Sequence, residues 1–95
     1  MAKQTGSDLA KLPNIGATMA QLLIQVGITT PAKLRRVGSI RAAALVAPLR
    51  PGGSSCRSLL SGLEGAIRGV RWHAIPKAER DALWQRFEAH NRRRS

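Results

Sequence analysis

Residues 12–23, Leu-Pro-Asn-Ile-Gly-Ala-Thr-Met-Ala-Gln-Leu-Leu, place a tight break between two helical segments. A proline and a glycine interrupt this stretch, and both residue types favour turns. Upstream of the break, Ser7 or Asp8 is placed to cap a short helix that ends at about Leu12. Downstream, apolar residues recur on one face of a helix from about Ala17 to Val26. The stretch therefore predicts two helices joined by a hairpin of a few residues.

The rest of the chain has the same helical period, because apolar residues recur three and four apart and no segment alternates as strands do. Thr30 before Pro31 opens one two-turn helix, and Gly38 ends it. Ser39 is expected to cap the next helix, which is almost wholly apolar. That helix is expected at about 40–47. After a loop at 48–53, further helices are expected from Ser54 or Ser55 to about Val70 and at about 77–90. The pattern predicts an all-α, compact single domain of five to six short helices.

Length and charge define the expected organisation. Ninety-five residues support one hydrophobic core, so we expect a flexible N-terminal segment at 1–6, a helical domain at 7–90 and a loose basic tail at 91–95. The chain carries 16 lysines and arginines against 5 acids, a net charge of +11, and removing the three arginines at 92–94 still leaves +8. The excess positive charge therefore belongs to the folded body as well as to the tail.

Several classes of protein are disfavoured by composition. One cysteine, Cys56, and two separated histidines form neither a disulfide framework nor a zinc ligand set. The five acids are dispersed and suggest neither a catalytic pair nor a magnesium site. No stretch approaches the roughly 20 apolar residues of a membrane span, and no signal peptide is evident. We expect a cytoplasmic, non-enzymatic protein that uses no metal, cofactor, membrane or small-molecule substrate.

The hairpin stretch resembles the helix-hairpin-helix motif, whose turn presents backbone N–H groups at the start of the second helix. These groups and the helix dipole favour a phosphate, so Asn14, Ile15 and Gly16 are candidate nucleic-acid-binding residues. Gly16 suits a tight turn, and Asn14 can adopt the left-handed backbone conformation. Thr18 stands where DNA-binding versions of the motif often carry lysine. A hairpin that only packs one helix against another is therefore an equal alternative.

Arginines provide the second signal for a polyanionic partner. Seven of them and a single acid, Glu64, lie between positions 35 and 71. The candidate phosphate contacts are Arg35, Arg36, Arg41, Arg57, Arg68 and Arg71. No helix carries a compact set of base-reading side chains, and no stacking aromatics accompany the charges. We therefore expect binding to nucleic acid, DNA in the first place, with low sequence specificity; the alternative is an adaptor that docks an acidic, transcription-related protein.

Two further features concern packing. Gly62, Gly65 and Gly69 are spaced three and four apart within an expected helix, where each costs about 1 kcal/mol relative to alanine. This cost predicts a helix-packing stripe that another helix approaches closely. Trp72 and Trp84 are both expected to pack the last helix against the core, with an exposed Trp84 at an interface as the alternative.

Three blocks of the chain, at 12–23, 26–38 and 59–72, resemble in order and spacing the C-terminal domain of the TfoX (Sxy) competence regulators. The resemblance covers about 8–83, and its most specific part is Leu-Glu-Gly-Ala-Ile-Arg-Gly-Val-Arg-Trp at 63–72. It implies an all-helical domain related to helix-hairpin-helix and SAM-like folds, found in bacterial regulators of DNA uptake and also as a free-standing protein. The two-domain regulators carry an α/β domain before this one that these 95 residues do not include, so the resemblance leaves the regulation of competence itself open.

Two local differences separate the chain from that family pattern. Ala17 and Thr18 stand where Pro-Lys is common, and Ser61 and Gly62 stand where Tyr-Ala is common. The first difference removes a lysine contact and the second removes an aromatic packing group.

Overall fold

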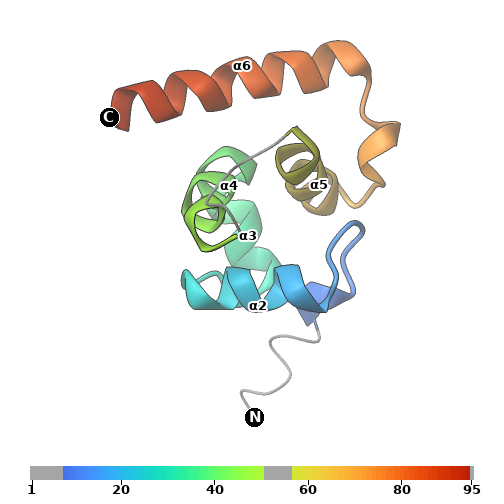
Figure 1. Cartoon of the computed structure of the whole chain (residues 1–95). Helices are drawn as coiled ribbons and strands as arrows, with labels where there is room; N and C mark the ends of the chain where they lie inside the picture. The colour runs from blue at the N-terminus through green and yellow to red at the C-terminus, as the bar shows by residue number, and fades with distance from the viewer. Residues whose placement is uncertain (1–7, 51–56, 95) are drawn as a thin grey trace.

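The computed structural model describes residues 8–50 and 57–94, and within these ranges the chain forms helices and no strand. The helices are α2 (Ala17–Gln25), α3 (Pro31–Val37), α4 (Ser39–Val46), α5 (Arg57–Arg68) and α6 (Lys77–Arg94), with short 3-10 helices η1 (Ala47–Leu49) and η3 (Trp72–Ala74). A further helical turn at 8–10 precedes α2. Figure 1 shows α4 and α5 between α6 on one side and α2 on the other. The predicted all-α single domain is confirmed.

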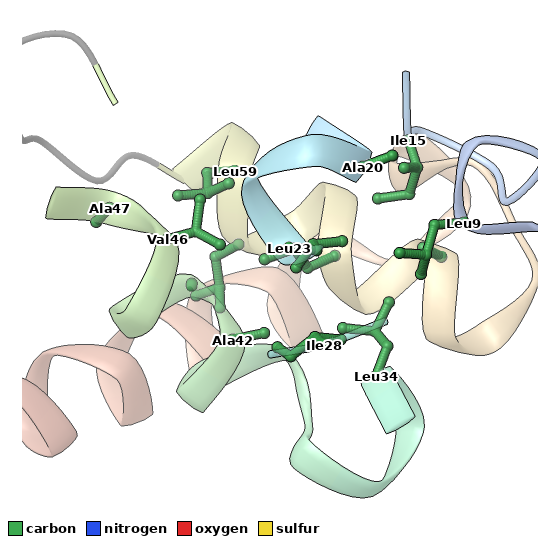
Figure 2. Close-up of a cluster of buried hydrophobic side chains, with 14 of the residues drawn as sticks. Leu9, Ile15, Ala20, Leu23, Ile28, Leu34, Ala42, Val46, Ala47 and Leu59 are labelled. Carbon is green, nitrogen blue, oxygen red and sulfur yellow. The ribbon is translucent and has the colours of Figure 1, made fainter. Parts of the chain in front are cut away.

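The core is one contiguous cluster of buried apolar side chains contributed by all the helices (Figure 2). Helix α4 lies at its centre, because it contacts α2, α3, α5 and α6. Such a helix needs apolar residues around most of its circumference. Ala42 and Ala43 are completely buried, and their small side chains allow close approach of the neighbouring helices. The almost wholly apolar sequence of α4 is thereby explained.

The start of α4 differs from the sequence prediction. Ser39 is the first residue of the helix rather than its cap, and Gly38 occupies the N-cap position with a φ of 88° and no side-chain hydrogen bond. The Ser39 hydroxyl donates instead to Glu64 Oε1 at 2.6 Å. This serine therefore joins α4 to α5, a contact that local sequence signals do not reveal.

The glycine stripe of α5 also has a different partner from the predicted helix. Gly62 and Gly65 are buried in α5 and face the side chain of Asn14, which lies in the turn before α2. Gly69 lies beyond the helix with a φ of 78° and no close neighbour. Its N–H donates to Ala66 O, and the N–H of Val70 donates to Gly65 O. This is the Schellman arrangement, so Gly69 ends α5 and takes no part in packing.

The last helix is longer than predicted, because α6 continues to Arg94 instead of ending at His90. No glycine or proline follows His90, and arginine is a good helix former. Residues 91–94 are therefore helical rather than a loose tail. Several predicted features lie outside the described residues: the segment 1–6, the proposed caps at Ser7, Ser54 and Ser55, and part of the loop at 48–53.

The two tryptophans have different environments, although the sequence predicts the same packing role for both. Trp84 packs against the core, with its ring centroid 5.3 Å from that of Phe87, as predicted. Trp72 is 40% exposed, so the prediction for this residue is wrong. The side chain that the same segment buries is Ile75, three residues later.

Candidate nucleic-acid interface

The turn before α2 is a four-residue reversal from Leu12 to Ile15, closed by a hydrogen bond from Ile15 N–H to Leu12 O of 3.2 Å. Pro13 occupies its second position and Asn14, with a φ of 69°, its third, as in a type II turn. The predicted left-handed conformation of Asn14 is confirmed. Gly16 has a φ of −103°, which any residue can adopt, so the turn does not depend on that glycine.

The side chain of Asn14 fixes the turn to the far end of α5. Its Nδ2 donates to Gly62 O at 3.3 Å and to Val70 O at 3.1 Å. Its Oδ1 accepts from the N–H of Trp72 at 3.2 Å. Figure 1 shows the turn beside the segment that follows α5. Asn14 therefore positions the hairpin, and its amide is committed to these contacts.

Gly65 makes room for that amide. A Cβ atom at position 65 would lie 2.6 Å from Asn14 Nδ2, 2.6 Å from Val70 O and 3.3 Å from the Cα of Trp72. Distances this short do not occur between real atoms of these kinds without a shift. The glycine is thus required by the hairpin and the loop that follows α5.

The start of α2 is open to an incoming anion. Gly16 is its N-cap and supplies no side-chain hydrogen bond, and the first turn holds no acidic residue. The first amides of a helix have no intrahelical acceptor, and they lie at the positive end of the dipole. Gly16, Ala17 and Thr18 are exposed, and a Cβ at position 16 would meet nothing within 4 Å. Three backbone N–H groups are therefore placed to bind an oxyanion.

Ile15 has a different role from its two neighbours. Its side chain is buried in the core cluster, near Ala20 and Leu9 (Figure 2). The residue therefore anchors the hairpin in the core, and only its backbone is available to a ligand.

Positive side chains surround this hairpin. Lys11 is exposed just before the turn, and Arg71 is exposed next to Trp72, whose amide binds Asn14. Arg50 lines a cleft of about 170 Å³ together with Asn14, Met19 and part of α5, and no acidic residue lines it. The sequence predicts Arg71 as a phosphate contact, counts Arg50 only within the excess of arginines and does not single out Lys11. The position of Lys11 beside the hairpin was a usable signal, whereas nothing in the sequence places Arg50 at the hairpin.

A second hairpin joins α3 to α4 and corresponds to the first. Leucine, an aliphatic residue, glycine and alanine recur 22 positions later in the chain: Leu12, Ile15, Gly16 and Ala20 match Leu34, Val37, Gly38 and Ala42. In both hairpins the glycine is the N-cap without a side-chain hydrogen bond, and the alanine is buried. The two hairpins thus form an internal repeat that helix period and cap signals do not reveal.

Arg35, Arg36 and Arg41 are grouped around the second hairpin. The first two lie in the last turn of α3, and the third lies in the first turn of α4. All three are exposed and form no ion pair with residues 8–50 or 57–94. Their charges are thus available to a polyanion.

An acid shares the second hairpin, which makes it a poorer phosphate site than the first. A cleft of about 380 Å³ there is lined by Gly38, Ser39, Arg41, Glu64, Arg86 and His90 among others. Burial raises the pKa of Glu64, but hydrogen bonds from Ser39 and Arg68, with the charges of Arg68 and Arg86, outweigh burial and hold the pKa below its usual value. The ionised carboxylate repels an anion at this helix start.

The two remaining candidates, Arg57 and Arg68, connect α5 to α6. Arg57 pairs with Asp81 at 3.0 Å and lies over the Trp84 ring, 5.8 Å from its centroid. Arg68 contacts Glu79 at 2.7 Å and Glu64 at 2.8 Å. Hydrogen bonds to Glu79 and Glu64 raise the pKa of Arg68 above its usual value. The structure thus gives both arginines acidic partners within the fold, whereas Arg35, Arg36, Arg41 and Arg71 have none among residues 8–50 and 57–94.

Together, the helices and the exposed turn before α2 define a small all-α domain. The chain belongs to the TfoX C-terminal domain family, whose model matches residues 5–87. The family predicted from the sequence blocks is thereby confirmed.

Two solved structures from Listeria monocytogenes are similar to the chain along most of its length. An uncharacterized protein in a triclinic crystal form shares 38% identity, with 87% of this chain and 92% of that chain covered and a TM-score of 0.76. A protein of unknown function in a tetragonal form shares 40% identity, with 86% and 98% covered and a TM-score of 0.74. A comparison with curated proteins found no significant match.

Among residues 8–50 and 57–94, no helix combines the length and the apolar character that crossing a bilayer requires. Within those ranges, no three histidine, cysteine or acidic side chains are grouped as metal ligands.

Proposed function

We propose that this domain is a non-enzymatic, cytoplasmic regulatory module that binds nucleic acid, duplex DNA in the first place, through backbone phosphates and with low sequence specificity. The observation that carries the proposal is the exposed start of α2, whose amides are uncapped and whose first turn holds no acid. The exposed Lys11 precedes this hairpin in the chain, and the exposed Arg71 precedes Trp72, whose N–H binds Asn14 in the hairpin. A phosphate at this position accepts hydrogen bonds from the N–H groups and is favoured by the helix dipole.

Long-range electrostatics support the same partner. The net charge is +11, and four of the arginines selected from the sequence are exposed without an acidic partner among the described residues: Arg35, Arg36, Arg41 and Arg71. Each phosphate that a cation neutralises releases counterions, so the logarithm of the affinity falls linearly with the logarithm of salt concentration. The expected slope is about −0.9 per phosphate contact.

The test is a salt titration of binding to two duplexes of unrelated sequence, followed by fluorescence anisotropy. We expect equal affinities for both duplexes, and we expect Arg71→Gln to make the slope shallower by about 0.9 if Arg71 contacts one phosphate. Arg57→Gln is the matched control, because it removes the same charge from a residue that is paired with Asp81. Asp81 keeps Lys77 as a partner in that variant.

Two results would contradict the proposed binding or the role of Arg71 in it. If the protein associates with neither DNA nor RNA at low salt, the proposal fails and the adaptor for an acidic protein replaces it. Equal effects of Arg71→Gln and Arg57→Gln would show that the protein responds to net charge alone and that Arg71 is not at the interface.

A further inference from the structure

Trp72 is a large aromatic side chain that the fold leaves at the surface. It is 40% exposed, and the neighbouring Val70 is 36% exposed. Burial of an indole is strongly favourable, so an exposed one in a small domain needs an explanation. The core does not use this side chain, because Ile75 is the residue of the segment that it buries.

The backbone of Trp72 is held rigidly against the hairpin. Its N–H donates to Asn14 Oδ1 at 3.2 Å, and its carbonyl accepts from the N–H of Ile75 at 3.1 Å. Its Cα packs where Gly65 lacks a side chain. The backbone that carries the indole therefore has a fixed position relative to the hairpin.

The ring itself lies among positive groups. The Arg80 guanidinium is 5.3 Å from the centroid of the Trp72 ring, and Arg80 Nε donates to Ile75 O at 3.0 Å, which orients it. The rings of Trp72 and His73 are nearly perpendicular to each other, with a centroid separation of 5.7 Å. Arg71, the preceding residue, is exposed and forms no ion pair with the described part of the chain. The Arg80 cation covers part of the ring, and the exposed remainder of the indole is accessible to another flat group.

We infer that Trp72 is a stacking platform for an unpaired nucleobase of a single strand whose phosphates lie on the hairpin, an inference that rests on the proposed function. Aromatic rings beside a positively charged backbone-binding surface are how proteins hold single-stranded nucleic acid. Bases inside a duplex are stacked on one another and cannot reach such a ring. The platform therefore gives the domain a preference for single-stranded regions that the arginines alone do not provide.

A protein partner fits the same surface less well. The exposed apolar area consists of one indole and Val70, which is much smaller than the patches that mark protein interfaces. Charged groups are depleted at the centre of such interfaces, whereas cations flank this ring. The surroundings of Trp72 match a ligand that has both a flat ring and a negative charge.

The test compares three probes of equal length: oligothymidylate, an abasic oligomer with the same phosphates, and a duplex. Trp72→Leu removes the ring but keeps the backbone N–H that binds Asn14. We expect this variant to bind oligothymidylate about 5- to 150-fold more weakly, the equivalent of one lost stacked base, and to bind the other two probes as the wild type does. Trp72→Phe, which keeps a ring, should recover part of the loss.

Trp84 supplies a matched control. In a Trp84→Phe protein, Trp72 is the only tryptophan, and its fluorescence should be quenched by oligothymidylate but not by the abasic oligomer. In a Trp72→Phe protein, the emission of the core residue Trp84 should not change with either probe.

Three results would overturn the inference. If Trp72→Leu binds oligothymidylate as tightly as the wild type while duplex binding persists, stacking is wrong and the phosphate-binding function stands. If no probe binds at low salt, both proposals fail. If polyglutamate quenches Trp72 as strongly as oligothymidylate does, the surface recognises acidic polymers rather than bases.

Discussion

Gly65→Ala is the substitution that most sharply tests how the hairpin is attached. The added Cβ would lie 2.6 Å from both Asn14 Nδ2 and Val70 O, and the second of these is backbone of the loop that follows α5. Neither atom can move without disturbing the contacts that hold Asn14. Gly62→Ala is the matched control in the same helix, because a Cβ there meets only Asn14 Cβ, at 3.6 Å.

The expected magnitude follows from opposing terms. Alanine favours a helix by about 1 kcal/mol over glycine. Overpacking at position 65 costs about 1–3 kcal/mol, and each Asn14 hydrogen bond that is displaced costs a further 0.5–1.5 kcal/mol or so. We therefore expect Gly65→Ala to lower the free energy of unfolding by about 2–3 kcal/mol. Gly62→Ala should raise it by about 0.5–1 kcal/mol, because helix propensity acts without a clash.

Urea unfolding followed by far-ultraviolet circular dichroism measures both values. The urea midpoints should move in opposite directions, with equal dependence of the free energy on urea concentration. If Gly65→Ala proves as stable as the wild type, or if the two variants change stability equally, the close approach of Asn14 to Gly65 is wrong.

Two further predictions concern side chains that join the elements. Asn14→Ala should lower the free energy of unfolding by about 2–4 kcal/mol, since it removes three hydrogen bonds and an amide suited to a positive φ; Asn14→Gly should be about 1 kcal/mol less harmful, because glycine adopts that φ freely. Equal stabilities of these two variants in urea would argue against the left-handed turn. For Glu64, a lowered pKa in the folded state means that its stabilising effect is complete above about pH 4.3, the unfolded value, and is lost as pH falls further. Glu64→Gln should lower the free energy of unfolding by about 1–2 kcal/mol at pH 7 and show a smaller decrease in thermal midpoint below about pH 4.3. An acid profile identical to that of the wild type would contradict the role of this carboxylate.

The fold was largely predictable because helical period, caps and stops are local signals. The spacing of apolar residues located the five helices α2 to α6, and Asn14 was correctly assigned a left-handed conformation. Helix ends were less accurate where tertiary contacts decide them. Ser39, for example, has the chemistry of a cap but binds Glu64 on another helix.

Sequence alone could not identify partners across the fold. The glycine spacing correctly indicated a close approach at position 65 but not that the approaching group is the side chain of Asn14. The charge count treated every arginine alike, whereas Arg68 is paired with acids from two helices. The exposure of Trp72 was missed because an indole is usually buried and only the packed structure shows that Ile75 replaces it.

The most direct test of the central claim places a carboxylate at the start of α2. Gly16→Asp should leave the fold intact, because a Cβ there meets nothing within 4 Å and aspartate is a favourable N-cap. Gln21→Glu is the matched control, since it makes the same unit decrease in charge at an exposed position further along α2. By fluorescence anisotropy at low salt, we expect Gly16→Asp to weaken duplex binding about 10- to 150-fold, the equivalent of losing the charge-assisted hydrogen bonds to one phosphate. Gln21→Glu should weaken binding only a few-fold, about as much as any single surface charge. Equal affinities for the two variants would contradict the claim that the hairpin amides bind phosphate.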